Sequence, residues 1–187
     1  MVLASRQGGV VGRSQLVELG YSRAAVGRAV AGGLLAPIHR GVYVVGHRHL
    51  ASAGRRFAAV LACGSSAVLS HVSAAEAWGL HPGARARYDV TVPRTLRPRP
   101  GLSPHRGVLA EDERTRLDGL PVTTVARTLL DLAAVLDEHR LERALERAEI
   151  LRLLDLGALS ALLGRYPRRA GTPALTGILR RAHSTRA

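Results

Sequence analysis

The chain has 187 residues, enough to bury a sizeable core, and its single cysteine, Cys63, excludes an intrachain disulfide. No apolar run approaches the ~18 residues of a membrane helix, and the first residues do not have the pattern of a secretory leader, so we expect a cytoplasmic protein without membrane partners. The net charge is +13, from 27 basic residues, all arginine, against 14 acidic ones, which favours a polyanionic partner.

The first predicted element is a short helix over residues 14–19. Its apolar residues Leu16, Val17 and Leu19 are expected on one side, with polar residues on the other. Gly20 then ends the helix, because glycine adopts the left-handed backbone at a helix C-terminus without steric cost.

A second helix is predicted to follow a tight turn. Ser22 is a suitable N-cap, and Val26 and Val30 recur at i and i+4 as an inward stripe. Arg23 and Arg28 fall away from this stripe, so both arginines are expected to face outward.

A hairpin is predicted after this helix, which ends at Gly32. Residues 34–38 and 42–45 have the composition of two strands, and the turn between them has His39 and Arg40 at its tip. The order helix, turn, helix and two-stranded wing is that of a winged helix-turn-helix.

In a helix-turn-helix the second helix enters the major groove with its N-terminal residues nearest the base edges. Arg23 is therefore the expected base reader, while Arg13, Arg28 and Arg40 are expected to hold phosphates, which positions a protein without reading sequence. The predicted DNA-binding residues are Arg13, Ser14, Ser22, Arg23, Arg28, His39 and Arg40. The alternative is a small α+β core whose arginines are merely solvated.

The distribution of charge supports an N-terminal site. Residues 1–56 contain many arginines and one acidic residue, Glu18, whereas residues 111–155 are rich in acids as well as bases. The basic face is thus expected at the N-terminus. A membrane-surface role is less favoured, because the arginine-bearing helix lacks a broad apolar face opposite its charges.

The remainder of the chain predicts a larger α+β domain with a small sheet and a C-terminal helical bundle. We therefore expect two domains, a winged helix-turn-helix over residues 1–46 and an α+β domain over residues 47–187. Strands are expected at 67–69, 88–92, 105–106 and 121–123, and helices at 50–63, 70–78, 124–133, 139–153, 156–163 and 173–181. The last two strands are expected to pair with strand 88–92.

Several residues outside the first domain invite a chemical interpretation. His71 stands beside serines, but capping or packing under Trp78 is the commoner role for such a residue. Arg127 and Asp131, at i and i+4, can form an ion pair that holds a helix against the sheet, or a catalytic pair. We favour the ion pair, because no nucleophile or metal cluster accompanies them.

A histidine pair, a proline-rich connector and the single cysteine also have both a chemical and a structural interpretation. His47 and His49 offer two imidazoles without an acidic or cysteine partner nearby, so no metal and no cofactor is expected. The connector over residues 93–100 is rich in proline and arginine and is expected to be a loop. Its arginines can contact phosphate or an acidic partner, although charge runs are usually just solvated. Cys63 is expected to be a buried thiol without a nucleophilic role.

Several motifs, in this order, resemble AbiEi-type antitoxins of type IV toxin-antitoxin systems. They are Gly20-Tyr21-Ser22-Arg23, Gly33-Leu34-Leu35, His39-Arg40-Gly41-Val42-Tyr43, Leu69-Ser70-His71, Ser73-Ala74-Ala75, Trp78-Gly79-Leu80, Pro121-Val122-Thr123-Thr124, Arg127-Thr128 and Asp131-Leu132-Ala133. The resemblance covers nearly the whole chain. It implies a non-enzymatic repressor that binds double-stranded operator DNA with inverted repeats, autoregulates its operon and opposes a nucleotidyltransferase-like toxin.

Two rival functions remain open. Many members of the resembled group continue into an endonuclease-like domain, whereas this chain ends at Ala187 and has no lysine for the nuclease motif. The first rival is therefore a non-catalytic scaffold, a remnant of such a fusion. The second is an enzyme that uses His71, Arg127 and Asp131, which requires these side chains to converge.

Overall fold

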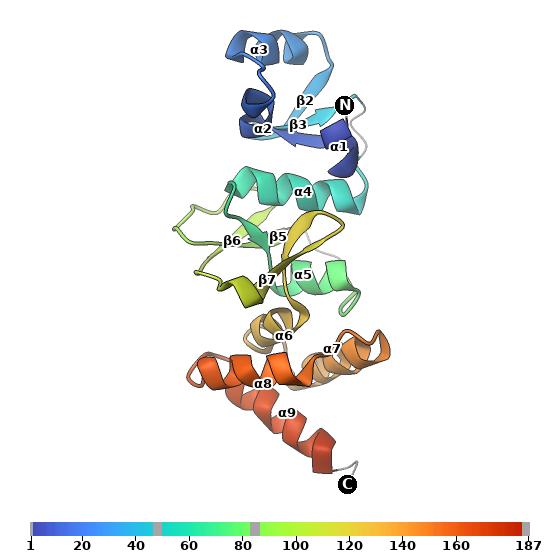
Figure 1. Cartoon of the computed structure of the whole chain (residues 1–187), viewed down its shortest axis with the longest axis vertical. Coiled ribbons are helices and arrows are strands. Elements are labelled where there is room, and N and C mark those ends of the chain that lie inside the picture. Colours follow the sequence, from blue (N-terminus) through green and yellow to red (C-terminus); the bar gives the residue numbers. More distant parts are fainter. Residues whose placement is uncertain (1, 47–49, 83–86, 185–187) are drawn as a thin grey trace.

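The computed structural model describes residues 2–46, 50–82 and 87–184 of the chain. It is an elongated α+β molecule in which three layers follow the sequence from one end to the other (Figure 1). A small N-terminal sheet with short helices comes first, a five-stranded sheet flanked by two helices lies in the middle, and a group of helices forms the C-terminal end.

The N-terminal layer is a three-stranded antiparallel sheet of order β1-β3-β2 with three helices around it. Its elements are α1 (Val2–Arg6), β1 (Val10–Gly12), α2 (Arg13–Glu18), α3 (Arg23–Ala31), β2 (Leu35–His39) and β3 (Val42–Val45). A small core of Val11, Leu16, Val26, Leu35 and Tyr43 joins the helices to the sheet. The predicted second helix and hairpin are confirmed.

The N-terminal sheet differs from the prediction in two respects. Residues 10–12, for which no element was predicted, form β1, which pairs with β3 along Val10–Gly12. Val17 and Leu19 are 58% and 59% exposed, so of the predicted apolar side only Leu16 is buried. Helix α2, with six residues, is too short to bury more than one apolar side chain against the sheet.

The middle layer contains a five-stranded sheet of order β6-β5-β4-β8-β7. Its elements are α4 (Ser52–Cys63), β4 (Val68–Leu69), α5 (His71–Trp78), β5 (Tyr88–Val92), β6 (Leu102–Arg106), the 3-10 helix η1 (Glu111–Glu113), β7 (Arg114–Leu117) and β8 (Leu120–Thr123). β6 pairs with β5 as predicted. The expected pairing of residues 121–123 with β5 is wrong, since β8 pairs with β4 and β7 instead.

The C-terminal layer is made of α6 (Val125–Ala133), α7 (Glu138–Ile150), α8 (Leu156–Arg165) and α9 (Thr172–Ser184). Helix α6 is buried along its whole length, and α7, α8 and α9 all pack against it. The predicted helical group is confirmed, and Thr124 caps α6, since its hydroxyl accepts a hydrogen bond from the amide of Arg127. Within the described ranges, no helix is long and apolar enough to cross a membrane.

Helix α4 lies between the two sheets and packs on both of them (Figure 1). One hydrophobic cluster contains Val10 and Val44 of the small sheet, Phe57 of α4, and Val90 and Val92 of β5. The small sheet therefore shares its core with the middle layer, which fixes the relative position of the two.

Candidate nucleic-acid interface

The predicted recognition helix, α3, buries one side and exposes an almost side-chain-free opposite side. Ser22 caps it, since its hydroxyl accepts a hydrogen bond from the amide of Ala25 at 3.1 Å. Val26 is 5% exposed and anchors the buried side. Arg23 and Arg28 are both exposed, about 140° apart around the helix at ~100° per residue.

Between these two arginines the exposed surface of α3 is formed by the small residues Ala24, Gly27 and Ala31. A Cβ added to Gly27 would meet nothing within 4 Å. A helix with this surface can approach a nucleic acid closely, with one guanidinium on each flank.

Arg13, the first residue of α2, ties the helix-turn-helix to the wing. Its amide donates a hydrogen bond to the carbonyl of Gly41 at 2.7 Å, and its Nη2 donates to the hydroxyl of Tyr43 at 2.8 Å. The Tyr43 side chain is buried in the small core, so its hydroxyl is a fixed acceptor. Arg13 is thus held in place on the same side as the wing turn.

A cavity of about 450 Å³ lies between α2, α3 and β3. Arg13 and Arg23, each the first residue of its helix, both line it, and its other lining residues are Val17, Val26, Gly27, Val30 and Tyr43. Two guanidinium groups on one concave surface attract anions, and the amide end of α3 adds to this attraction. The arrangement suits a nucleic acid whose phosphate lies against Arg13 while Arg23, beside it, reaches a base edge.

The two predicted DNA-binding residues of the wing tip, His39 and Arg40, differ in exposure. Arg40 is exposed at the turn, where Gly41 has a positive φ of 79°. The pKa of His39 lies below its ordinary value, because the ring is desolvated and because Arg99 is near. Ser14 is exposed on α2. In all, six of the seven predicted DNA-binding residues are exposed, and His39 is half-buried.

Sequence reasoning missed the polar contacts that hold the first helix. The side-chain amides of Gln7 and Gln15 bond each other reciprocally at 3.0 and 3.1 Å, and Gln15 also accepts the amide of Gly12 at 2.9 Å. Gln7 is 5% exposed and lies in the turn after α1. A polar residue in a segment too short to show periodicity gives no signal of this kind.

The N-terminal part of the chain is similar to a known family. Residues 3–46 match the model of a family described as "Transcriptional regulator, AbiEi antitoxin". Residues 3–46 are called the AbiEi domain below, after the family model that they match. This confirms the resemblance to AbiEi antitoxins over the helix-turn-helix and wing, the part of the chain that carries all seven predicted DNA-binding residues.

The whole chain was also compared with curated proteins and with solved structures. No curated protein matches the chain. Among solved structures, the crystal structure of the RV2827C protein from Mycobacterium tuberculosis is similar, with 19% sequence identity and a TM-score of 0.42 over 78% of this chain and 69% of that one.

Outside the AbiEi domain, the structure brings His71, Arg127 and Asp131 together inside the protein. Arg127 Nε donates to Asp131 Oδ1 at 2.9 Å, which confirms the predicted ion pair. His71 Nδ1 lies 3.9 Å from Asp131 Oδ2. All three side chains are buried, and Arg127 also donates to Glu113 Oε2 at 2.5 Å, so this cluster joins η1, α5 and α6.

His71 shares this interior with a second imidazole. Its ring stacks on that of His105 at 3.8 Å between centroids, and His105 Nε2 lies 3.0 Å from Asp89 Oδ1. Burial lowers the pKa of His71 to about 4, although Asp131 opposes this shift. His71 is therefore neutral at neutral pH and packs on His105, whereas the sequence predicted capping or packing under Trp78.

The paired histidines and the single cysteine were the other residues considered for a chemical role. His47 and His49 lie outside the described residues, and among the residues described no group of three or more histidine, cysteine, aspartate or glutamate side chains could hold a metal ion. Cys63 is buried as predicted, and burial raises the pKa of its thiol. A raised pKa disfavours the reactive thiolate.

Proposed function

We propose that this chain is a DNA-binding transcriptional regulator of the AbiEi antitoxin type, which acts without catalysis. The observation that carries the proposal is the cavity shared by Arg13 and Arg23, with Arg13 bound to the wing turn through Gly41 and Tyr43. Helices α2 and α3 thereby present Arg13 and Arg23 on one concave surface, which is hydrogen-bonded to the wing through Arg13. A duplex backbone is the polyanion that fits such a surface.

The proposed division of labour follows from position on the two helices and the wing. Arg23, at the start of α3, reads base edges, and the exposed small residues beside it allow the helix to enter the major groove. Phosphates are held by Arg13, Arg28 and Arg40, with Ser14, Ser22 and His39 as neighbouring polar contacts. Operators with inverted repeats fit this scheme, one half-site for each bound chain.

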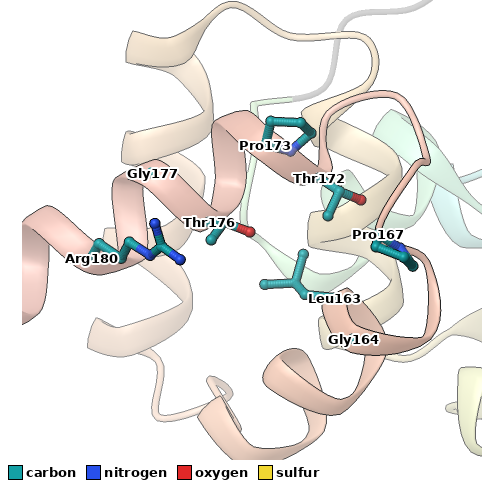
Figure 2. A pocket seen from close by; sticks show the side chains of 8 residues that line it. All are labelled: Leu163, Gly164, Pro167, Thr172, Pro173, Thr176, Gly177 and Arg180. Carbon is teal, nitrogen blue, oxygen red and sulfur yellow. The ribbon is translucent and has the colours of Figure 1, made fainter.

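The regulatory role is proposed from the AbiEi family. The chain binds the region upstream of its own operon, represses it and opposes a nucleotidyltransferase-like toxin, as in a type IV toxin-antitoxin system. The helical C-terminal end offers surface for such a partner. A hollow of about 470 Å³ lies between α8 and α9, with Leu163 and Thr176 on facing walls (Figure 2).

The test is binding of the purified chain to its own upstream region and to a scrambled duplex, each over a series of salt concentrations. Arg23→Ala is expected to lose most of the preference for the upstream region, by about 1–3 kcal/mol, because one good base contact is worth that much. Arg28→Ala is expected to weaken binding to both duplexes alike and to make the salt dependence shallower by about one phosphate contact. Equal binding to both duplexes by the unaltered chain would contradict the regulator and favour the scaffold.

A second experiment addresses the toxin. Co-expression of the chain with a nucleotidyltransferase encoded beside it is expected to restore growth. Arg23→Ala, which affects only DNA reading, is expected to restore growth equally well. Growth arrest despite a stable antitoxin would remove the toxin-antitoxin part of the proposal while leaving DNA binding untouched.

A further inference from the structure

The positive charge of the chain extends well beyond the AbiEi domain. Residues 1–46 contain five arginines and one acidic residue, a net charge of +4, whereas residues 47–110 contain nine arginines and two acidic residues, a net charge of +7. One of those two acids, Asp89, is buried beside His105, and the other, Glu76, pairs with Arg56 at 3.0 Å. Residues 47–110 therefore carry a larger net positive charge than residues 1–46, the segment assigned to DNA.

Part of this charge lies on the connector between β5 and β6, residues 93–101. Arg94, Arg97 and Arg99 are all exposed on it. The connector is nevertheless fixed to the sheet at several points: Leu96 packs against the shared hydrophobic cluster, and the amide of Leu102 donates to the carbonyl of Arg99 at 3.0 Å. These arginines are thus displayed from an anchored segment.

The connector lies beside the wing. A Cβ added to Gly101 would stand 3.7 Å from Cε1 of His39, the last residue of β2. The lowered pKa of His39, caused by burial and then by the charge of Arg99, reflects the same proximity. His39 directly precedes Arg40, so the exposed arginine of the wing tip and those of the connector belong to neighbouring segments.

The relative position of the two segments is held by the packing around α4. Gly8, in the turn before β1, approaches the backbone of Gly54 so closely that a Cβ on Gly8 would lie 2.6 Å from the Gly54 amide nitrogen. The small sheet and β5 also share one hydrophobic cluster. This packing holds the connector beside the wing, so a duplex bound by the wing can also contact the connector.

We propose that Arg97 and Arg99 of the connector form a second DNA-contacting element outside the AbiEi domain, which binds the phosphate backbone beyond the segment gripped by the wing. This inference rests on the proposed function, since it needs a duplex on the wing. An acidic protein partner is the alternative ligand for the same arginines. The adjoining wing tip favours DNA, because both segments then bind one continuous row of phosphates.

The test compares the full chain with Arg97→Ala/Arg99→Ala on a 30-base-pair duplex of mixed sequence over a salt series. A matched control is Arg143→Ala/Arg168→Ala, which removes the same charge from exposed positions of the C-terminal layer. Each lost phosphate contact lowers the slope of log K against log salt by about 0.9, so the connector variant is expected to lose about 1.8 and the control close to none. Thermal unfolding should be the same for both, since all four side chains are exposed.

The outcomes separate this inference from the proposed function. If Arg23→Ala/Arg28→Ala weakens binding while the connector variant keeps the slope of the control, the connector inference is overturned and the regulator stands. If the connector variant alone changes the slope, the connector binds DNA and the recognition helix does not. No binding by the unaltered chain overturns both. An unchanged slope with lost toxin neutralisation would reassign the connector to an acidic protein.

Discussion

Gly8 and Gly54 meet backbone to backbone where the AbiEi domain packs on α4. A Cβ on Gly54 would overlap the carbonyl oxygen of Gly8, and Gly8 itself has a positive φ of 63°, which disfavours any side chain there. Neither residue can be enlarged without moving the small sheet away from α4.

Gly54→Ala is therefore expected to destabilise the chain by about 1–3 kcal/mol, the usual cost of forcing an added methyl into a packed contact. Gly164→Ala in α8 is the control, because a Cβ there meets nothing within 4 Å and alanine favours a helix interior. Urea unfolding of both variants measures the difference. Equal stability of the two would show that the small sheet is not held by this contact.

The buried ion pairs around Arg127 predict a second large effect. Its guanidinium, 3% exposed, bonds Glu113 and Asp131, both of them fully buried. Arg127→Leu leaves two buried carboxylates without this partner, which costs about 3–5 kcal/mol in comparable cases. Arg114→Ala, which breaks only the exposed pair with Glu111, is expected to change stability by less than about 0.5 kcal/mol. Chemical unfolding at pH 7 distinguishes them.

The lowered pKa of His71 predicts how the free energy of unfolding depends on pH. Because burial lowers its pKa from 6.5 to about 4, the unfolded chain binds more protons than the folded one between these values. The contribution of His71 is thus fully present above pH 6.5 and is lost as the pH falls toward 4. The shift corresponds to about 3 kcal/mol, since one pKa unit is about 1.4 kcal/mol.

His71→Asn is expected to flatten this part of the pH profile. Asparagine tolerates the positive φ of 50° at this position and does not titrate. His139→Asn, at an exposed position of α7, should leave the profile unchanged. Thermal unfolding between pH 4 and pH 7 provides the measurement, and parallel profiles for the chain and both variants would contradict the lowered pKa.

Substitutions at Ser22 can distinguish its role as the cap of α3 from its predicted contact with DNA. Ser22→Ala loses the hydrogen bond to the amide of Ala25 and is expected to cost about 1 kcal/mol. Ser22→Asp restores the cap but places a carboxylate where phosphate is expected. It should therefore fold as stably as the unaltered chain and bind duplex DNA more weakly, whereas undiminished binding by Ser22→Asp would move the DNA away from the start of α3.

The sequence was most informative where local signals are strong. Ser22 and Gly32 bound α3 at the expected residues, because a cap and a helix-ending glycine act within a few residues of chain. The hairpin of β7 and β8 was missed although Asp118-Gly119, with positive φ at both residues, is a favourable two-residue turn. That signal was present in the sequence and could have been used.

Other features could not be predicted from the sequence. β1 is three residues long and exists only through its pairing with β3. The bond between Arg13 and Tyr43 spans 30 residues, and the approach of Gly101 to His39 spans more. The first contact depends on the placement of α2 beside β3, and the second on the packing of the two sheets against α4. No local pattern encodes either.

The most direct test of the central claim is the ratio of the dissociation constants for a scrambled duplex and for the upstream region of the operon, measured with the purified chain at about 0.15 M salt. We expect a ratio of about 10³ or more, as for specific regulators, and a fall of at least tenfold in this ratio on Arg23→Ala. A ratio near one, with binding to both duplexes that disappears together as salt rises, would mean that only bulk charge attracts DNA and would contradict sequence-specific regulation.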